Sequence, residues 1–491
     1  MASTLLWPSL PMEIRLMILE LLPQEHRALA SYASVCNEWA EFIEKKNFGR
    51  LKLGASSLNN LEHMVSRQRS LVRHIWLNIE LRPYTCRSCQ WMESESWMSS
   101  NNTIISRAIS KLFTILSTWN PAGDGLALEL SAQSPSDTEH YFKNFYFGTD
   151  DEDKDILFDP KNHLQEFIHD PKHGWVDGQQ VAAPCHVSLR RLYEEVRLTS
   201  REELPVLHVV TKLVLRRQFR RRLNIRALRL LLDKLPRLEC IVYEPWQVWG
   251  RMQQRYYDKE YKTMIDAHLP KGLKRLSIFE DYNDDFITVL QGTIDQTDPI
   301  RIAEPTVGAA FAYRSLDLQQ LSVSFMVDAW HFFQARQPLW TWGQLQSLVL
   351  TSRLLTQAED RWKVSNLLED AGAAALQMPK LHTMALWNGG KGQACAFIYR
   401  RDFGKTSIVW RGTWEMNLEP RVIRAWERVV STLEYTTSYS LRVESQPLCP
   451  GIIGSHGDAI HQLDLPIGVV DPTSLWQIRR EGLTGWGRSG P

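Results

Sequence analysis

The chain has 491 residues with 57 basic and 56 acidic side chains, so its formal net charge is +1. This balance predicts no overall attraction to nucleic acid or anionic membranes, and any such binding would need a local patch. No stretch reaches about 18 consecutive apolar residues, so no membrane span is expected. Only seven cysteines and no signal-peptide pattern indicate a reduced compartment, cytosol or nucleus.

The first predicted helix follows Pro11, which suits the first helical position, and ends at Pro23. Its apolar residues recur at helical spacing and predict one apolar face: Ile14, Met17, Ile18, Leu21 and Leu22. Two further short helices are predicted at 28–35 and 37–46. Three short helices in about 40 residues lie near the lower size limit for an independent core, so this module must dock on something.

Residues 8–50, roughly a tenth of the chain, carry a family pattern. Leu-Pro-x-Glu-Ile, Ile-Leu-x-x-Leu and Val-Cys-x-x-Trp are matched by Leu10, Pro11, Glu13, Ile14, Ile18, Leu19, Leu22, Val35, Cys36 and Trp39. The segment therefore resembles an F-box, and its third helix is similar to those of F-box proteins of filamentous fungi. It departs from the pattern at "QEHRALAS", where Leu29 is the only candidate for the usual leucine.

The resemblance implies that a Skp-type adaptor subunit binds this segment and links the chain to a cullin-RING ubiquitin ligase. The residues that it places at this contact are Leu10, Pro11, Ile14, Ile18, Leu22, Leu29, Val35 and Trp39. The alternative is a helical cap whose apolar face packs on the chain's own body.

A second pattern begins at residue 72. Apolar residues spaced three and then two apart recur at Val72-Ile75-Leu77, Val210-Leu213-Leu215, Leu238-Ile241-Tyr243, Leu273-Leu276-Ile278, Leu318-Leu321-Val323, Leu345-Leu348-Leu350 and Leu381-Met384-Leu386. This is the strand segment of a leucine-rich repeat, and amphipathic helical stretches at 103–119, 225–235 and 364–378 would return the chain. "LALEL" at 126–130 is a further candidate strand.

The repeats are irregular. Successive starts from Val210 are 28, 35, 45, 27 and 36 residues apart, beyond the period of about 20–29 residues of regular repeats. Another layered α/β fold therefore remains the alternative. Near the end, "ACAFIYRR" and "TSIVWRGTW" predict paired strands across Asp402–Lys405, and Pro420 begins an amphipathic helix.

These patterns predict an α/β chain of two parts. Residues 1–54 form a three-helix F-box, and residues 55–491 form an irregular leucine-rich-repeat-like α/β solenoid. This body contains an acidic insertion near 149–185 and a strand-strand-helix ending at 395–435.

Cys86 and Cys89 form a C-x-x-C pair, which is half of a structural zinc site. No second pair exists, and Cys185-His186 would complete a site only if the tertiary fold brought it close. We therefore expect two reduced thiols in a loop, and no metal or cofactor.

The strongest local charge is "RRQFRRRLNIR" at 216–226. Arginine forks bind phosphate and carboxylate groups, so the candidate target contacts are Arg216, Arg217, Arg220, Arg221 and Arg222. The alternatives are a solvated loop, pairing with the acidic stretch 149–159, or phosphate groups of nucleic acid, which the neutral net charge disfavours.

No phosphate-binding, dinucleotide, nucleophile-elbow or zinc-protease motif is present. The expectation is a non-catalytic adaptor subunit that holds a target protein near a ubiquitin ligase. Two alternatives stay open: a protein-interaction scaffold independent of any ligase, and a phosphate or nucleic-acid binder acting through residues 216–226.

Overall fold

The computed structural model describes residues 7–21, 31–120, 123, 125–146, 168–199, 203–291, 301–402, 405–432 and 440–484. Leu22, Leu29 and the acidic stretch 149–159 lie outside these ranges, as do the first three residues, 28–30, of the second predicted helix. Within them, no helix is long and apolar enough to cross a membrane.

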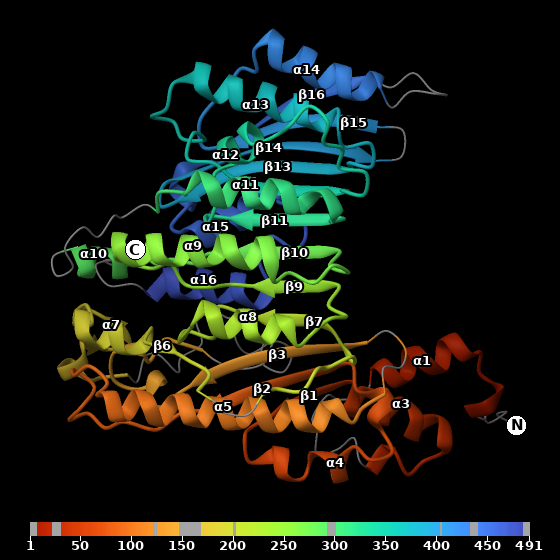
Figure 1. Ribbon diagram of the computed structural model, residues 1–491, viewed down its shortest axis with the longest axis vertical. Helices are drawn as coiled ribbons and strands as arrows, with labels where there is room; N and C mark the ends of the chain where they lie inside the picture. Colours follow the sequence, from red (N-terminus) through yellow and green to blue (C-terminus); the bar gives the residue numbers. More distant parts are fainter. Residues whose placement is uncertain are drawn as a thin grey trace, which may run out of the picture.

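A mixed α/β architecture is built on one sheet whose strands stack along the long axis of the molecule (Figure 1). In the described residues the sheet has 12 strands. They are β1 (Arg50–Leu53), β2 (His74–Glu80), β3 (Leu126–Gln133), β7 (Val210–Leu215), β9 (Cys240–Tyr243), β10 (Arg275–Phe279), β11 (Gln320–Ser324), β12 (Ser347–Thr351), β13 (Thr383–Gly390), β14 (Gln393–Asp402), β15 (Lys405–Gly412) and β16 (Leu441–Pro447). Two minor pairs, β4 (Trp175–Val176) with β5 (Gln179–Gln180) and β6 (Glu195–Val196) with β8 (Arg222–Leu223), lie outside it.

The strands occur in the sheet in the same order as in the chain. All neighbouring pairs from β1 to β13 are parallel, and only β14 runs antiparallel to its neighbours β13 and β15. Parallel neighbours need a long crossover between them, which explains why helices separate most of the strands.

The register aligns one apolar residue from each of the eight sheet strands between β2 and β13. This ladder consists of Ile75, Leu128, Leu213, Ile241, Leu276, Leu321, Leu348 and Met384. Each of them is at most 4% exposed. Apart from Leu128, they are the middle members of the triplets found in the sequence, so the predicted strands and their inward faces are confirmed.

One face of the sheet is covered by helices, which lie in front of it in Figure 1. They are α5 (Glu95–Ser117), α8 (Ile225–Asp233), α9 (Arg251–Ala267), α11 (Pro305–Arg314), α12 (Ala329–Gln334), α13 (Arg361–Ala375) and α14 (Pro420–Ser431). Their apolar side chains join the strand ladder in one large core. The predicted helical returns and the helix that begins at Pro420 are confirmed.

The last two helices, α15 (His456–Leu463) and α16 (Pro472–Thr484), pack on the opposite face. Successive strand residues point to opposite faces, so Val349 and Trp387 enter a second core with Ala459 and Ile460 of α15. Gly389 permits this close approach, because a Cβ atom there would lie 2.4 Å from the Cβ atom of Ala459. The sequence patterns did not predict this return of the chain.

At the N-terminal end, α1 (Met12–Glu20) and α3 (Asn37–Gly49) precede the sheet, and α3 continues directly into β1. β1 pairs with β2, so the sheet begins at Arg50, inside the segment that the sequence assigned to the N-terminal module. The remaining helices, α4 (Leu61–Met64), α7 (His186–Leu192) and α10 (Asp284–Gln291), are peripheral to the sheet.

Candidate functional site

Helix α1 turns its apolar stripe outward. Ile14, Met17, Ile18 and Leu21 are 43%, 59%, 37% and 83% exposed. They are spaced i, i+3, i+4 and i+7, the pattern of a stripe that normally faces a core. Leu19 alone of this helix is fully buried. We call Ile14, Met17, Ile18 and Leu21 the α1 stripe.

Arg15, on the other side of α1, holds the helix against α3. Its guanidinium lies 2.7 Å from Glu38, which also accepts a hydrogen bond of 2.9 Å from the indole of Trp7. Trp39 is partly buried with its ring 5.1 Å from that of Trp7. Of the other residues predicted to contact an adaptor, Leu10 is partly buried, and Pro11 and Val35 are exposed. Trp39 therefore packs the α1–α3 pair together more than it offers a surface.

The arginine cluster at 216–222 is placed inside the protein. Arg216, Arg217, Arg220 and Arg221 are each at most 3% exposed, and only Arg222 is partly exposed. The expectation of a solvated loop is therefore wrong for these four side chains. Their guanidinium groups also offer no accessible surface to a target protein.

Carboxylates from distant parts of the chain neutralise the four buried arginines. Arg216 pairs with Glu129 at 2.5 Å, and Arg221 pairs with Glu93 at 2.8 Å. Glu481 on α16 accepts hydrogen bonds of 2.9 and 2.8 Å from Arg217 and contacts Arg220 as well. The acidic stretch 149–159, which the sequence offered as a pairing partner, lies outside the described residues.

Asp281 connects this buried network to α15. It contacts Arg217 and lies 2.9 Å from Nε2 of His456. Burial alone would raise the pKa of Asp281, but the Arg217 guanidinium and the hydrogen bond to His456 outweigh it and hold the pKa below its ordinary value. For the same reason, Arg217 and Arg220 lower the pKa of buried Glu481. The network thus fixes the C-terminal helices to the sheet.

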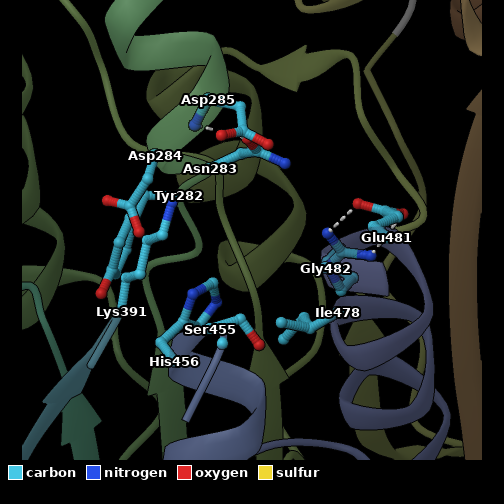
Figure 2. A pocket seen from close by; sticks show the side chains of 12 residues that line it. Tyr282, Asn283, Asp284, Asp285, Lys391, Ser455, His456, Ile478, Glu481 and Gly482 are labelled. Carbon is cyan, nitrogen blue, oxygen red and sulfur yellow. Dashed lines mark hydrogen bonds and ion pairs between the residues drawn. The ribbon is translucent and has the colours of Figure 1, made fainter. Parts of the chain in front are cut away.

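A small cavity of about 40 Å³ lies against this network (Figure 2). Figure 2 shows its walls coming from the start of α10, the start of α15 and the end of α16, with Asp284, His456 and Glu481 on these three elements. The ring of Tyr282 stacks on His456 with centroids 4.4 Å apart, and its hydroxyl donates to the carbonyl of Gly389 at 3.0 Å. These contacts stabilise the fold, because the polar groups around the small cavity form hydrogen bonds and ion pairs with one another.

A larger cavity of about 480 Å³ adjoins the first and shares Tyr282, Asp284 and Lys391 with it. Its walls come from the segments that follow β9 to β13, at the carboxyl ends of the parallel strands. Phe325 in this wall has a backbone φ of 65°, in the left-handed region where residues other than glycine are strained. We call it the strand-end cavity.

The charges at the strand-end cavity are of two kinds. Asp328 is 8% exposed, and its carboxylate accepts hydrogen bonds from Ser352 and from the backbone N–H of Arg353. The side chains of Arg353 and Lys391 are exposed, and neither forms an ion pair with another described residue. The cavity therefore presents two cationic side chains, and Asp284 and Glu359 add carboxylates to the same wall.

The C-x-x-C pair has neighbours that sequence spacing did not indicate. Cys86 and Cys89 lie beside His140 and His173, and these four residues could hold a metal ion. Cys185, the alternative considered from the sequence, contacts Ser188 at 3.1 Å instead and is not part of the group.

Comparison with known proteins gives one match. Residues 268–471 match a family described as a family of unknown function (DUF6546). The matched region spans β10 to β16, α15 and most of the wall of the strand-end cavity. No match was found among curated proteins or among solved structures.

Proposed function

We propose that this chain is the substrate-recognition adaptor of an SCF-type cullin-RING ubiquitin ligase. Residues 8–50 act as an F-box and bind a Skp-type adaptor, and the body binds the target protein. The chain makes and breaks no bond itself. It contributes proximity, because tethering raises the effective concentration of target lysines near the ubiquitin-carrying enzyme. The cytosol or nucleus is the compartment in which we expect it to act.

The outward α1 stripe carries this proposal. The four apolar side chains of the α1 stripe, which lie on α1 and its C-cap residue, are 37–83% exposed, and Val35 in the turn before α3 is 59% exposed. A contiguous exposed apolar patch of this kind marks an interaction site. In the alternative, a helical cap that packs on the chain's own body, the stripe would instead face the chain's own core. The F-box-like sequence pattern then names the class of partner.

We also propose that the body is an irregular leucine-rich-repeat-like solenoid. In support, the strands are added in chain order, they are parallel up to β13, and helices cover one face. The ladder of aligned apolar residues matches the L-x-x-L-x-L spacing. The return of α15 and α16 onto the other face restricts where a target can bind, and the strand-end cavity is the site that we favour.

Calorimetry with a purified Skp-type adaptor tests the adaptor half of the proposal. Wild type is compared with Ile14→Asp and Leu21→Asp, each of which places a charge in the α1 stripe. Leu339→Asp is the matched control, because Leu339 is 95% exposed and lies far along the chain. We expect binding by wild type and the control, and affinity at least about 100-fold weaker in both stripe variants, since a buried unpaired charge is costly.

Absence of binding by folded wild-type protein would reject the ligase role and leave the ligase-independent scaffold. The target half is tested by Arg353→Glu combined with Lys391→Glu in cells. We expect adaptor binding to be unchanged and ubiquitin modification of the dependent target proteins to fall. No observation favours the phosphate or nucleic-acid alternative, because four of its five arginines are buried against carboxylates.

A further inference from the structure

Two cysteines and two histidines meet at the carboxyl end of β2. Cys86 and Cys89 lie in the turn that follows this strand, His140 begins the 3-10 helix η5 (His140–Phe142), and His173 ends the 3-10 helix η6 (Pro171–His173). One ligand atom from each side chain lies within 4.8 Å of the other three. The group therefore gathers three separate segments of the chain at one point.

The distances match a tetrahedral metal centre. Zinc–sulfur and zinc–nitrogen bonds of about 2.3 and 2.0–2.1 Å place sulfur and nitrogen ligands about 3.6 Å apart in a tetrahedron. Nε2 of His173 lies 3.4 Å from Sγ of Cys86 and 3.5 Å from Sγ of Cys89. Since both sulfurs sit at this separation from one nitrogen, a single ion can reach all of them.

The surroundings of His173 orient it as a ligand. Its Nδ1 lies 2.7 Å from the carboxylate of Asp170, which is held by the ammonium group of Lys143 at 2.8 Å. A carboxylate on the far nitrogen fixes the tautomer that presents Nε2 to a metal, as is usual around zinc-bound histidines. The ammonium group of Lys172 lies 2.9 Å from Sγ of Cys86.

The turn that carries the cysteines is fixed from the opposite side by α7. Ser188 donates to the carbonyl of Cys89 at 2.8 Å. Arg191 donates to the carbonyls of Ser88 and Trp91 at 3.1 and 2.7 Å. The two sulfurs are therefore held in place by contacts that do not involve the histidines, which is the support that a preformed site needs.

His140 supplies an independent indication of a ligand site. Its Nε2 atom is buried and has no hydrogen-bond partner among the described residues, and the carboxylate of Glu139 is 3.6 Å away. A buried polar atom without a partner calls for an explanation. The backbone of His140 also has a left-handed φ of 55°, a strained conformation that is often found at functional positions.

We propose that Cys86, Cys89, His140 and His173 bind one Zn²⁺ ion in a closed structural site. Two thiolates and two imidazoles are a ligand set of structural zinc centres, and four protein ligands leave no open position for a substrate. The ion fastens η5 and η6 to the turn after β2. Nearby aromatic side chains then pack around it, with the ring of Tyr141 5.0 Å from that of His173.

Metal analysis of the full-length protein tests this assignment. Protein produced with added zinc is dialysed, and its zinc content is measured by mass spectrometry for wild type, Cys89→Ser, His173→Asn and the matched control Cys185→Ser. We expect about one zinc ion per chain in wild type and the control, and less than about a tenth of that in the two ligand variants. Asp170→Asn should bind zinc about tenfold more weakly.

Cobalt substitution in wild type keeps the test decisive if the ligand variants do not fold. We expect a tetrahedral visible spectrum and a thiolate-to-cobalt charge-transfer band. Zinc-free wild type after zinc exposure, an octahedral cobalt spectrum, or equal zinc loss in Cys185→Ser would overturn the proposal. None of these readouts involves the Skp-type adaptor, so the outcome is independent of the proposed ligase role.

Discussion

Removal of Glu481 should detach α16 from the sheet. Its carboxylate is 6% exposed and accepts from Arg217 and Arg220, which are each 1% exposed. Removing one partner of a buried ion pair costs about 3–5 kcal/mol, because the remaining charge stays buried without compensation. Arg217 keeps Asp281 as a partner, so Glu481→Ala should lie near the lower end, at about 3 kcal/mol of unfolding free energy.

Urea unfolding followed by circular dichroism measures this loss. Glu427→Ala is the control, because Glu427 is exposed on α14, and surface substitutions of this kind change stability by less than about 0.5 kcal/mol. Glu481→Gln keeps an acceptor and should lie between the two. Hydrogen exchange should accelerate in α16 and stay unchanged in α13.

A loss in Glu481→Ala no larger than that of Glu427→Ala would refute the reasoning. It would mean that water or rearranged side chains compensate Arg217 and Arg220, and that the buried network does not hold α16.

Three further predictions concern the same framework. The folded-state pKa values of Asp281 and Glu481 are below their ordinary values, so the native state binds fewer protons than the unfolded state in acid. The stability that these two carboxylates contribute should be complete above about pH 5 and fall as the pH drops further. Asp281→Asn should reduce this slope in acid unfolding curves. Gly389→Ala should lower the unfolding free energy by about 1–3 kcal/mol, because the added methyl group overpacks against Ala459. Adding Ala459→Gly should restore part of the urea midpoint. An unchanged midpoint in Gly389→Ala would contradict the close approach of α15. Trp426→Ala should lower the unfolding free energy by about 3–5 kcal/mol, because Trp426 is fully buried between α14 and the sheet. Trp362→Ala is the control and should change thermal stability far less, because the Trp362 side chain is 60% exposed.

The local sequence predicts all the described strands of the sheet except β1 and β16. Short apolar stretches bounded by turn residues fill a buried parallel strand wherever it is placed. This is why the sequence alone predicts that Leu276, Leu321 and Leu348 face inward, and why it predicts the amphipathic helix at Pro420. The pattern gave no signal for α15 and α16, whose apolar residues pack on a face that only the assembled sheet provides.

Tertiary structure alone decided what the charged and metal-binding residues do. Arg217 contacts Asp281 and Glu481, which are 64 and 264 residues away in the chain. The local sequence "RRQFRRRLNIR" therefore predicts a charged surface patch, although four of its arginines form a buried network. Cys86 and Cys89 meet histidines from two later segments for the same reason. The sequence by itself determined which residues of α1 form one apolar face, because helix periodicity is local. Whether that face points inward or outward depends on the neighbours that long-range packing brings to it.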